Sequence, residues 1–244
     1  MMALENGKHV LCEKPLTINA KQSQRLCDTA KEKKLFFMVA IWSRFFESYT
    51  YLKQRIVNGD LGDVKEVNVE FGISLSHHER LFLKNGGGAV LDLGVYPIEV
   101  GMWAFQAAPT EVHTLGKLNE NGIDVEYAGE LQFPNGGVSK FKCSVLTGYS
   151  NTATIKGTKG QIVLHDFWCP IKITDIDGST KTWELPKGRY DFLLKNSPGL
   201  RFEAEEGKLE SSSINHEDSL TIARTQDKLR KLLGVRFAED DLDY

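Results

Sequence analysis

The stretch that most constrains this 244-residue chain is a short apolar strand that ends in a charged pair and a proline. Residues Val10–Cys12 are apolar in succession, which is typical of a strand covered on both faces. Pro15 cannot extend a central strand, and it biases Lys14 toward extended backbone. Glu13 and Lys14 should therefore project from the carboxyl end of the strand, where open α/β sheets bind ligands. An ordinary Lys-Pro turn is the alternative.

The residues that follow predict a strand, a helix and a second strand in parallel. Residues Asn19–Lys33 have a helical apolar face and basic residues in the last turn. Residues Leu35–Ile41 are wholly apolar and predict a second buried strand. This spacing is typical of a βαβ unit, which implies a parallel sheet. Two strands cannot form a stable doubly wound sheet, so this segment should be the end of a larger domain.

After residue 41 the pattern changes from helices to a series of short strands. We expect helices at 42–58, Leu91–Phe105 and His216–Leu233, with Gly234 capping the last. Strands are expected at Val67–Ile73, Glu111–Leu118, Val125–Phe133, Val138–Leu146, Thr152–Lys156, Gln161–His165, Ile171–Ile176 and Thr180–Leu185. The predicted fold is α/β and α+β: residues 1–41 are the C-terminal remnant of a Rossmann domain, and residues 42–244 are an α+β domain with a large, mostly antiparallel sheet.

Composition excludes several classes of protein. Hydrophobic residues make up 41% and charged residues 26%, with a net charge of -3 and no basic block. Binding to nucleic acid or to a membrane is therefore not expected. The cysteines are widely spaced without a C-x-x-C pair, which predicts reduced thiols and a cytoplasmic location. His77 and His78 should point apart as neighbours in a loop, so we expect no metal site.

A second group of residues combines a glycine run with two polar side chains. Residues Gly86–Gly88 allow backbone to approach a ligand closely, and Asp92 and Tyr96 share a face if they are helical. A nearby lysine ammonium would lower the pKa of Tyr96 and make it a workable proton donor or acceptor. The alternative is structural, with Asp92 capping a helix and Tyr96 packed beneath the sheet.

Both groups resemble motifs of the glucose-fructose oxidoreductase/inositol dehydrogenase (Gfo/Idh/MocA) family. The Glu13-Lys14-Pro15 sequence resembles its Glu-Lys-Pro signature, and Asp92 to Tyr96 resembles its Asp-x-Gly-x-His segment. Tyrosine in place of the histidine is similar to the dihydrodiol dehydrogenase branch. The resemblance extends from Gly7 nearly to the end of the chain.

The resemblance implies a set of roles for these residues. Lys14 and Tyr96 would transfer the proton that accompanies hydride transfer, and Asp92 would fix the polar end of the substrate. The residues implied in cofactor binding are Glu13, Lys14, Pro15 and Arg44. The residues implied in substrate binding are Trp42, Phe71, His78, Trp168 and Phe192. Aromatic walls suit an apolar ring with two hydroxyls, although aromatic side chains mostly fill cores.

The resemblance also implies NADP as cofactor and a trans-dihydrodiol or D-xylose as substrate. No G-x-G-x-x-G fingerprint stands between a strand and a helix, so we expect weak NADPH binding. The Met1–Met2 pair falls where relatives have residues in the middle of a helix, which favours an internal start. The alternative function is a truncated, inactive paralogue that acts as a dimerisation or regulatory protein.

A homodimer through the antiparallel sheet is also expected. The strand that contains Val138, Phe141, Cys143 and Val145 has more apolar residues than one covered face needs. The resemblance to the family also implies pairing through this sheet.

Overall fold

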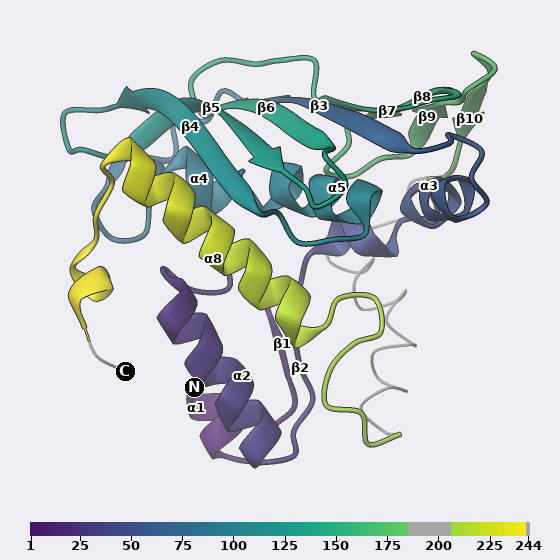
Figure 1. The fold of residues 1–244 in the computed structure, drawn as a ribbon. Helices are drawn as coiled ribbons and strands as arrows, with labels where there is room; N and C mark the ends of the chain where they lie inside the picture. Colours follow the sequence, from purple (N-terminus) through teal and green to yellow (C-terminus); the bar gives the residue numbers. More distant parts are fainter. Residues whose placement is uncertain (185–205, 243–244) are drawn as a thin grey trace.

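Two sheets of unequal size organise the chain in the computed structural model, which describes residues 1–184 and 206–242 (Figure 1). In the smaller sheet, β1 (Val10–Cys12) pairs in parallel with β2 (Phe37–Val39). Helix α2 (Ala20–Glu32) connects them and begins at Asn19, whose side chain accepts a hydrogen bond from the backbone N–H of Gln22. The predicted parallel βαβ unit is confirmed.

The larger sheet has eight strands in the order β10-β9-β8-β7-β3-β6-β5-β4. Their bounds are β3 Val64–Gly72, β4 Glu111–Leu118, β5 Asp124–Gln132, β6 Val138–Ser144, β7 Thr152–Gly157, β8 Gly160–His165, β9 Lys172–Thr174 and β10 Thr180–Thr182. Strands β3 and β6 run parallel, with Glu66 opposite Val138, and the other pairs are antiparallel. A parallel pair needs a long crossover, and here the chain passes through helices and a hairpin before it returns. The predicted fold class is confirmed.

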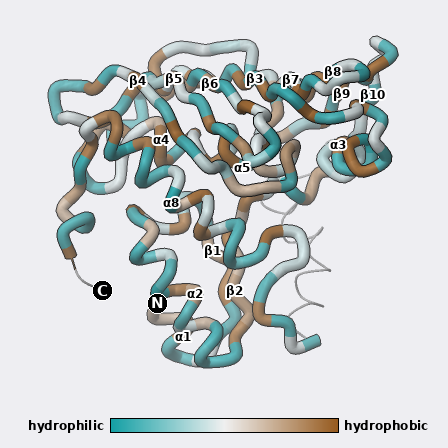
Figure 2. Tube along the Cα trace, in the orientation of Figure 1, coloured by the Kyte–Doolittle hydropathy of each residue, from teal (hydrophilic) through white to brown (hydrophobic). Residues whose placement is uncertain are grey.

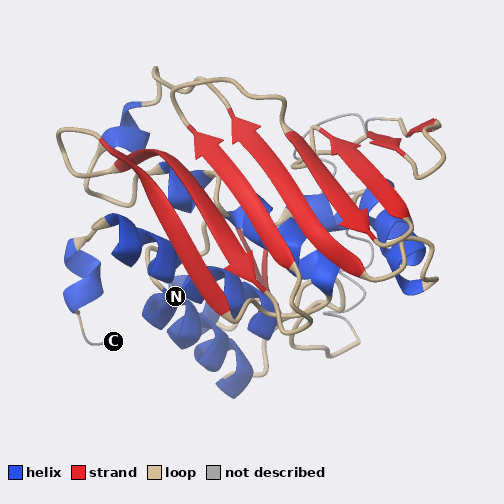
Figure 3. Ribbon diagram, turned by 45° about the horizontal axis from the view of Figure 1, so that its top comes forward, coloured by secondary structure: helices blue, strands red, loops and turns tan. Residues whose placement is uncertain are grey.

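Helices cover one face of this sheet and leave the other face bare (Figure 3). Helix α5 (Val95–Phe105) is buried along its whole length, and all residues of the short α4 (Ala89–Asp92) are buried too. The short α1 (Met2–Glu5) packs against α2 instead, beside the small sheet. Helix α8 (His216–Leu233) contacts β4, α5 and α2, so it packs against both sheets. Figure 2 shows hydrophobic residues along α5 and the strands above it. The division into residues 1–41 and 42–244 stays a prediction.

The bare face of the sheet is charged, which corrects one expectation. Phe141 and Cys143 of β6 are buried, while Lys140 and Lys142 between and beside them point outward. A strand alternates its side chains between two faces, so these apolar residues belong to the core. The outer face has ion pairs such as Lys142–Glu70 at 2.8 Å.

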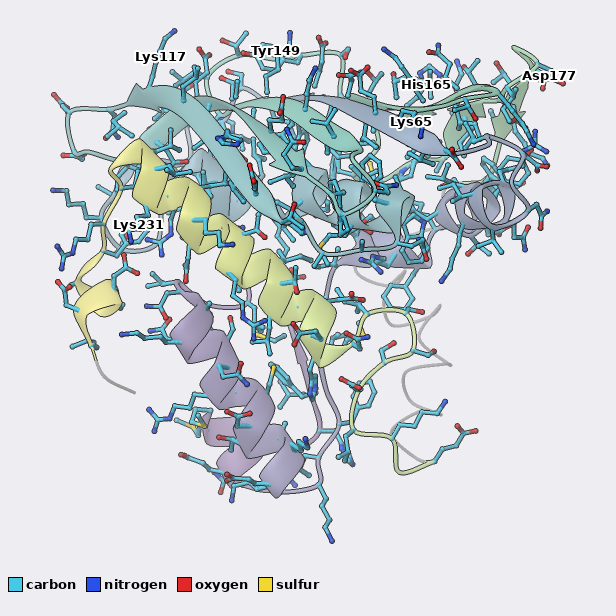
Figure 4. All side chains as sticks on the ribbon, viewed as in Figure 1. Lys65, Lys117, Tyr149, His165, Asp177 and Lys231 are labelled. Atoms are coloured by element: carbon cyan, nitrogen blue, oxygen red, sulfur yellow. The ribbon has the colours of Figure 1, made fainter. Side chains whose placement is uncertain are left out.

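Figure 4 shows Lys65, Lys117 and Tyr149 projecting from the same outer face. Val145 is also buried, and Val138 is half-buried. The apolar surface that motivated the predicted dimer is therefore absent from this part of the described sheet.

Two predicted helices are interrupted. The helix expected at 42–58 is a 3-10 turn, η1 (Trp42–Phe45), followed by α3 (Glu47–Val57), because Phe46 has extended backbone at φ -75° and ψ 139°. The helix expected at Leu91–Phe105 is α4 and α5, which are separated by two residues. Pro97 then falls in the first turn of α5, where its missing N–H breaks no hydrogen bond. Two more 3-10 turns are η2 (Glu79–Phe82) and η3 (Ala238–Asp241).

A buried ion pair joins η1 to α5. Arg44 Nε lies 2.5 Å from Glu99 Oε1, and both side chains are almost fully buried. The guanidinium also stacks over Trp103 and donates to the carbonyl oxygen of Ser213 at 3.2 Å. Burial raises the pKa of Glu99, while Arg44 acts in the opposite direction. Removing one partner would leave a charge buried without compensation.

No helix among residues 1–184 and 206–242 is long and apolar enough to cross a membrane.

We expect Arg44→Met to lower the free energy of unfolding by about 3–5 kcal/mol, because Glu99 would lose its counter-charge. Guanidinium denaturation measures the change. The matched control is Lys142→Met, which breaks an exposed pair with Glu70 and should cost less than about 1 kcal/mol. Equal losses in the two variants would contradict a special role for the buried pair.

Candidate active site

Lys14 connects the small sheet to the helices beneath the large one. It lies two positions after the end of β1, and its peptide bond to Pro15 is cis. Lys14 Nζ donates to the backbone oxygen of Asp92 at 2.7 Å and lies 3.4 Å from Asp92 Oδ1. The side chain of Lys14 is 19% exposed, so the ammonium is reachable although largely enclosed. The turn therefore projects a cation at the carboxyl end of the strand, as its sequence predicts.

Asp92 receives a second cation that the sequence did not reveal. It is the last residue of α4, and Arg80 Nη2 from η2 lies 3.1 Å from the same Oδ1 that faces Lys14. The Arg80 side chain is 64% exposed, so it borders the site from the solvent side. Arg80 and Asp92 are twelve positions apart along the chain, and no repeating pattern links them. The loop conformation alone brings them together.

Tyr96 is in the first turn of α5 and lies beside Lys14. Lys14 Nζ is 5.4 Å from the centroid of the Tyr96 ring, and the tyrosine is 5% exposed. Burial raises the pKa of Tyr96, and the indole N–H of Trp42 offsets only part of this effect. The expected lowering of the pKa by Lys14 is therefore wrong for this arrangement, because desolvation of the phenolate dominates. Tyr96 is a neutral phenol here and can donate a proton.

Three of the predicted aromatic residues gather around Tyr96. The ring of Phe71 meets Tyr96 edge-on with centroids 5.7 Å apart, and Trp168 lies 6.3 Å from Tyr96. Trp42 contacts Trp168 with centroids 5.5 Å apart. These rings come from β3, η1 and the segment after β8, so only the tertiary structure unites them. Phe192 lies outside the described residues.

The remaining predicted residues lie around or away from this cluster. Glu13 is exposed and accepts a hydrogen bond from the backbone N–H of Lys14 at 3.1 Å. Pro15 is half-buried at the turn. Arg44 is engaged in the buried pair described above, and its role toward a cofactor stays a prediction.

The two neighbouring histidines differ from expectation. His78 is exposed and precedes η2, so it lies on the same loop as Arg80. The rings of His77 and His78 have centroids 4.1 Å apart, which corrects the expectation that they point apart. No group of three or more potential metal ligands occurs among residues 1–184 and 206–242.

The site thus combines an ammonium, a carboxylate and a neutral phenol beside an aromatic wall. These groups suit a polar oxygen that gains or loses a proton, next to an apolar ring. Their position at the end of a parallel strand is also where dinucleotides bind in open α/β sheets. The donor set therefore fits a nicotinamide cofactor and an alcohol or carbonyl substrate.

Family models match both parts of the chain. Residues 1–41 match the oxidoreductase family NAD-binding Rossmann fold, and residues 49–163 match the GFO/IDH/MocA C-terminal domain. Human trans-1,2-dihydrobenzene-1,2-diol dehydrogenase is 34% identical over 250 residues, which cover 98% of this chain and 75% of the relative. The Danio rerio enzyme of the same name is 33% identical with the same coverage.

Solved structures share the fold at lower identity. The aldose-aldose oxidoreductase from Caulobacter crescentus, complexed with glycerol, has a TM-score of 0.81 at 19% identity, covering 94% of this chain and 71% of that one. A levoglucosan dehydrogenase, complexed with NADH and levoglucosan, has a TM-score of 0.79 at 21% identity. The match covers 95% of this chain and 73% of the levoglucosan dehydrogenase chain.

The raised pKa of Tyr96 is open to direct measurement. An ordinary tyrosine ionises near about pH 10. We expect the difference in ultraviolet phenolate absorbance between wild type and Tyr96→Phe to stay flat up to about that pH. A phenolate signal lost in Tyr96→Phe well below that pH would contradict the dominance of burial.

Proposed function

Because the chain belongs to the Gfo/Idh/MocA oxidoreductase family, we propose that it serves the NADP-dependent oxidation of a vicinal diol. The substrate we favour is a trans-dihydrodiol of an aromatic ring, with a sugar such as D-xylose as the second candidate. The observation that carries the proposal is the Lys14–Asp92 contact beside Tyr96 and its aromatic neighbours. The four cysteines are free thiols, which fits the cytoplasmic location expected from the sequence.

The cofactor would be held at the turn that follows β1. Bound NADP would accept the hydride that leaves the carbon atom of the alcohol. Glu13, Lys14 and Pro15 line this turn at the carboxyl end of a parallel strand, which supports their assignment to cofactor binding. Arg44 is the weakest member of the proposed set, because its guanidinium is already paired with Glu99. The choice of NADP over NAD rests on the likeness to the dihydrodiol dehydrogenase branch.

The substrate would lie between the aromatic wall and Asp92. The rings of Phe71, Trp42 and Trp168 would pack against an apolar ring, which suits a dihydrodiol better than a fully polar sugar. Asp92 would accept a hydrogen bond from one hydroxyl. Arg80 and Lys14 both contact Oδ1 of this carboxylate, so the acceptor is oriented before the substrate binds.

Tyr96 and Lys14 would move the proton of the reacting hydroxyl. The neutral phenol of Tyr96 is suited to give its proton to a carbonyl oxygen in the reducing direction. In the oxidising direction a phenolate must form, and the Lys14 ammonium nearby lowers the cost of that charge. Burial works against the phenolate, so the oxidation should speed up as pH rises.

The kinetic test compares Tyr96→Phe with wild type, using a trans-dihydrodiol and NADP at concentrations that offset the weak cofactor binding expected from the sequence. Loss of the phenol should lower turnover by about 10²–10⁴-fold with little change in cofactor binding, because the proton moves only as the hydride does. Lys14→Met should cost at least as much. The fold-loss of turnover in the double variant should be far smaller than the product of the two single losses, since the residues act as one unit.

Tyr149→Phe is the matched control for these kinetics and should keep wild-type turnover. A Tyr96→Phe variant with more than about half of wild-type turnover would remove Tyr96 from the mechanism. If the wild-type chain itself has no turnover with dihydrodiols or D-xylose, the proposed activity is wrong for this chain. The inactive dimerisation or regulatory protein would then be the better description.

We also propose a homodimer through the bare face of the large sheet, and the support for it is the likeness to the family rather than an apolar surface. Because Lys142, Glu70 and their neighbours make this face charged, the dimer should weaken as salt rises. Light scattering at micromolar concentration should give twice the mass of the chain at low salt. A monomeric mass at low salt would argue against pairing, and Lys142→Glu should shift the equilibrium toward monomer.

A further inference from the structure

A buried carboxylate that touches neither Lys14 nor Tyr96 holds the helix that presents Asp92. Asp124 is the first residue of β5 and has no exposed surface. Its Oδ2 accepts a hydrogen bond from the backbone N–H of Val90 at 2.6 Å, in the first turn of α4. This bond satisfies a backbone donor that has no partner within the helix. Asp124 therefore fixes the N-terminal end of α4.

Gly88 makes this close approach possible. It precedes α4 with φ 110°, in the region that favours glycine. A Cβ atom at this position would lie 2.4 Å from Asp124 Oδ1, which is too close for any side chain. The third glycine of the run therefore serves the contact between β5 and α4.

A buried amide holds the other side of the same helix. Gln226 of α8 is 5% exposed, and its Nε2 donates to the backbone oxygen of Val90 at 2.8 Å and to that of Leu91 at 3.3 Å. The Val90 oxygen also accepts from the backbone N–H of Gly94 at 3.1 Å, so the amide adds a second bond there and gives Leu91 a side-chain partner. Asp124 of β5 and Gln226 of α8 thus both hydrogen-bond to the backbone of α4.

Helix α4 needs such support because it has only four residues. A single helical turn is unstable by itself, so its position depends on the groups that contact it. Asp92 closes α4, and its backbone oxygen is the acceptor nearest to Lys14 Nζ. A shift of α4 would therefore move the acceptor of the ammonium as well as the carboxylate.

We propose that Asp124 and Gln226 are positioning residues that place Asp92, and through it Lys14, by holding α4 at both ends. The proposal rests on the proposed function for the importance of Lys14, but not for the geometry. Burial raises the pKa of Asp124 to about 7, so the neutral acid is well populated near neutral pH. The role therefore needs an acceptor of this shape rather than a charge, and an asparagine should fill it.

The test measures how well Lys14 is held, without any turnover. The folded chain is acetylated with acetic anhydride, and mass spectrometry gives the modification rate of Lys14 relative to Lys65 in the same sample. Lys65 is an internal reference because it lies on the outer face of the sheet and is 55% exposed. Circular dichroism and thermal melting establish that each variant is folded.

The conservative and disruptive variants should differ. Asp124→Asn keeps an acceptor for the Val90 N–H, so the ratio should stay within about twofold of wild type. Asp124→Leu removes that acceptor, and the ratio should rise by about fivefold or more, as expected for loss of one buried hydrogen bond. An unchanged ratio in folded Asp124→Leu, or an equal rise in both variants, would overturn the proposal.

A second pair of variants decides the outcome if Asp124→Leu does not fold. Gln226→Leu removes the donor to Val90 and Leu91, so it should raise the Lys14 ratio in the same way. Gln226→Glu keeps the shape but lacks the N–H donor, and it should behave like Gln226→Leu. Ratios within about twofold of wild type in both would overturn the proposal. If the wild-type chain shows no turnover but the disruptive variants raise the Lys14 acetylation ratio, the proposed function is refuted and this inference stands.

Discussion

The hydrogen bond from Lys14 to the backbone of Asp92 is the contact on which the site depends. It connects residues 78 positions apart and joins the end of a parallel strand to a helix beneath the large sheet. Without it the distance between the Lys14 ammonium, next to the small sheet, and the Tyr96 phenol, under the large sheet, would not be fixed. Each partner is held in turn, Lys14 by the turn after β1 and Asp92 by α4. The site is therefore built at a junction, as ligand sites often are.

Burial determines the chemical state of the residues at this junction. Tyr96 is enclosed by aromatic rings, so its proton is hard to remove. The cation of Lys14 acts across the ring and is not hydrogen-bonded to the hydroxyl in the described structure. Substrate and cofactor would bring further polar groups into this space. The aromatic wall thus provides a surface for an apolar ring and a dry environment for the phenol.

The large sheet supports the site through its order of strands. β3 is central, and Phe71 at its end contacts Tyr96 from above. The parallel pairing of β3 with β6 requires the crossover that includes α4 and α5. The same topology therefore produces the covered core and supplies both Asp92 and Tyr96. α8 then closes the structure against both sheets, which is why Gln226 can reach α4.

The sequence by itself determined the elements with strong local signals. The β1–α2–β2 unit, the short strands after residue 110 and the span of α8 follow from apolar periodicity, caps and turns. Lys14, Asp92 and Tyr96 were recognisable because they stand in short motifs. The tertiary structure decided what depends on distant groups: the break at Phe46, the inward direction of Phe141, the raised pKa of Tyr96 and the arrival of Arg80 at Asp92. Desolvation and ion pairing depend on which residues meet in space, and local spacing does not contain that information.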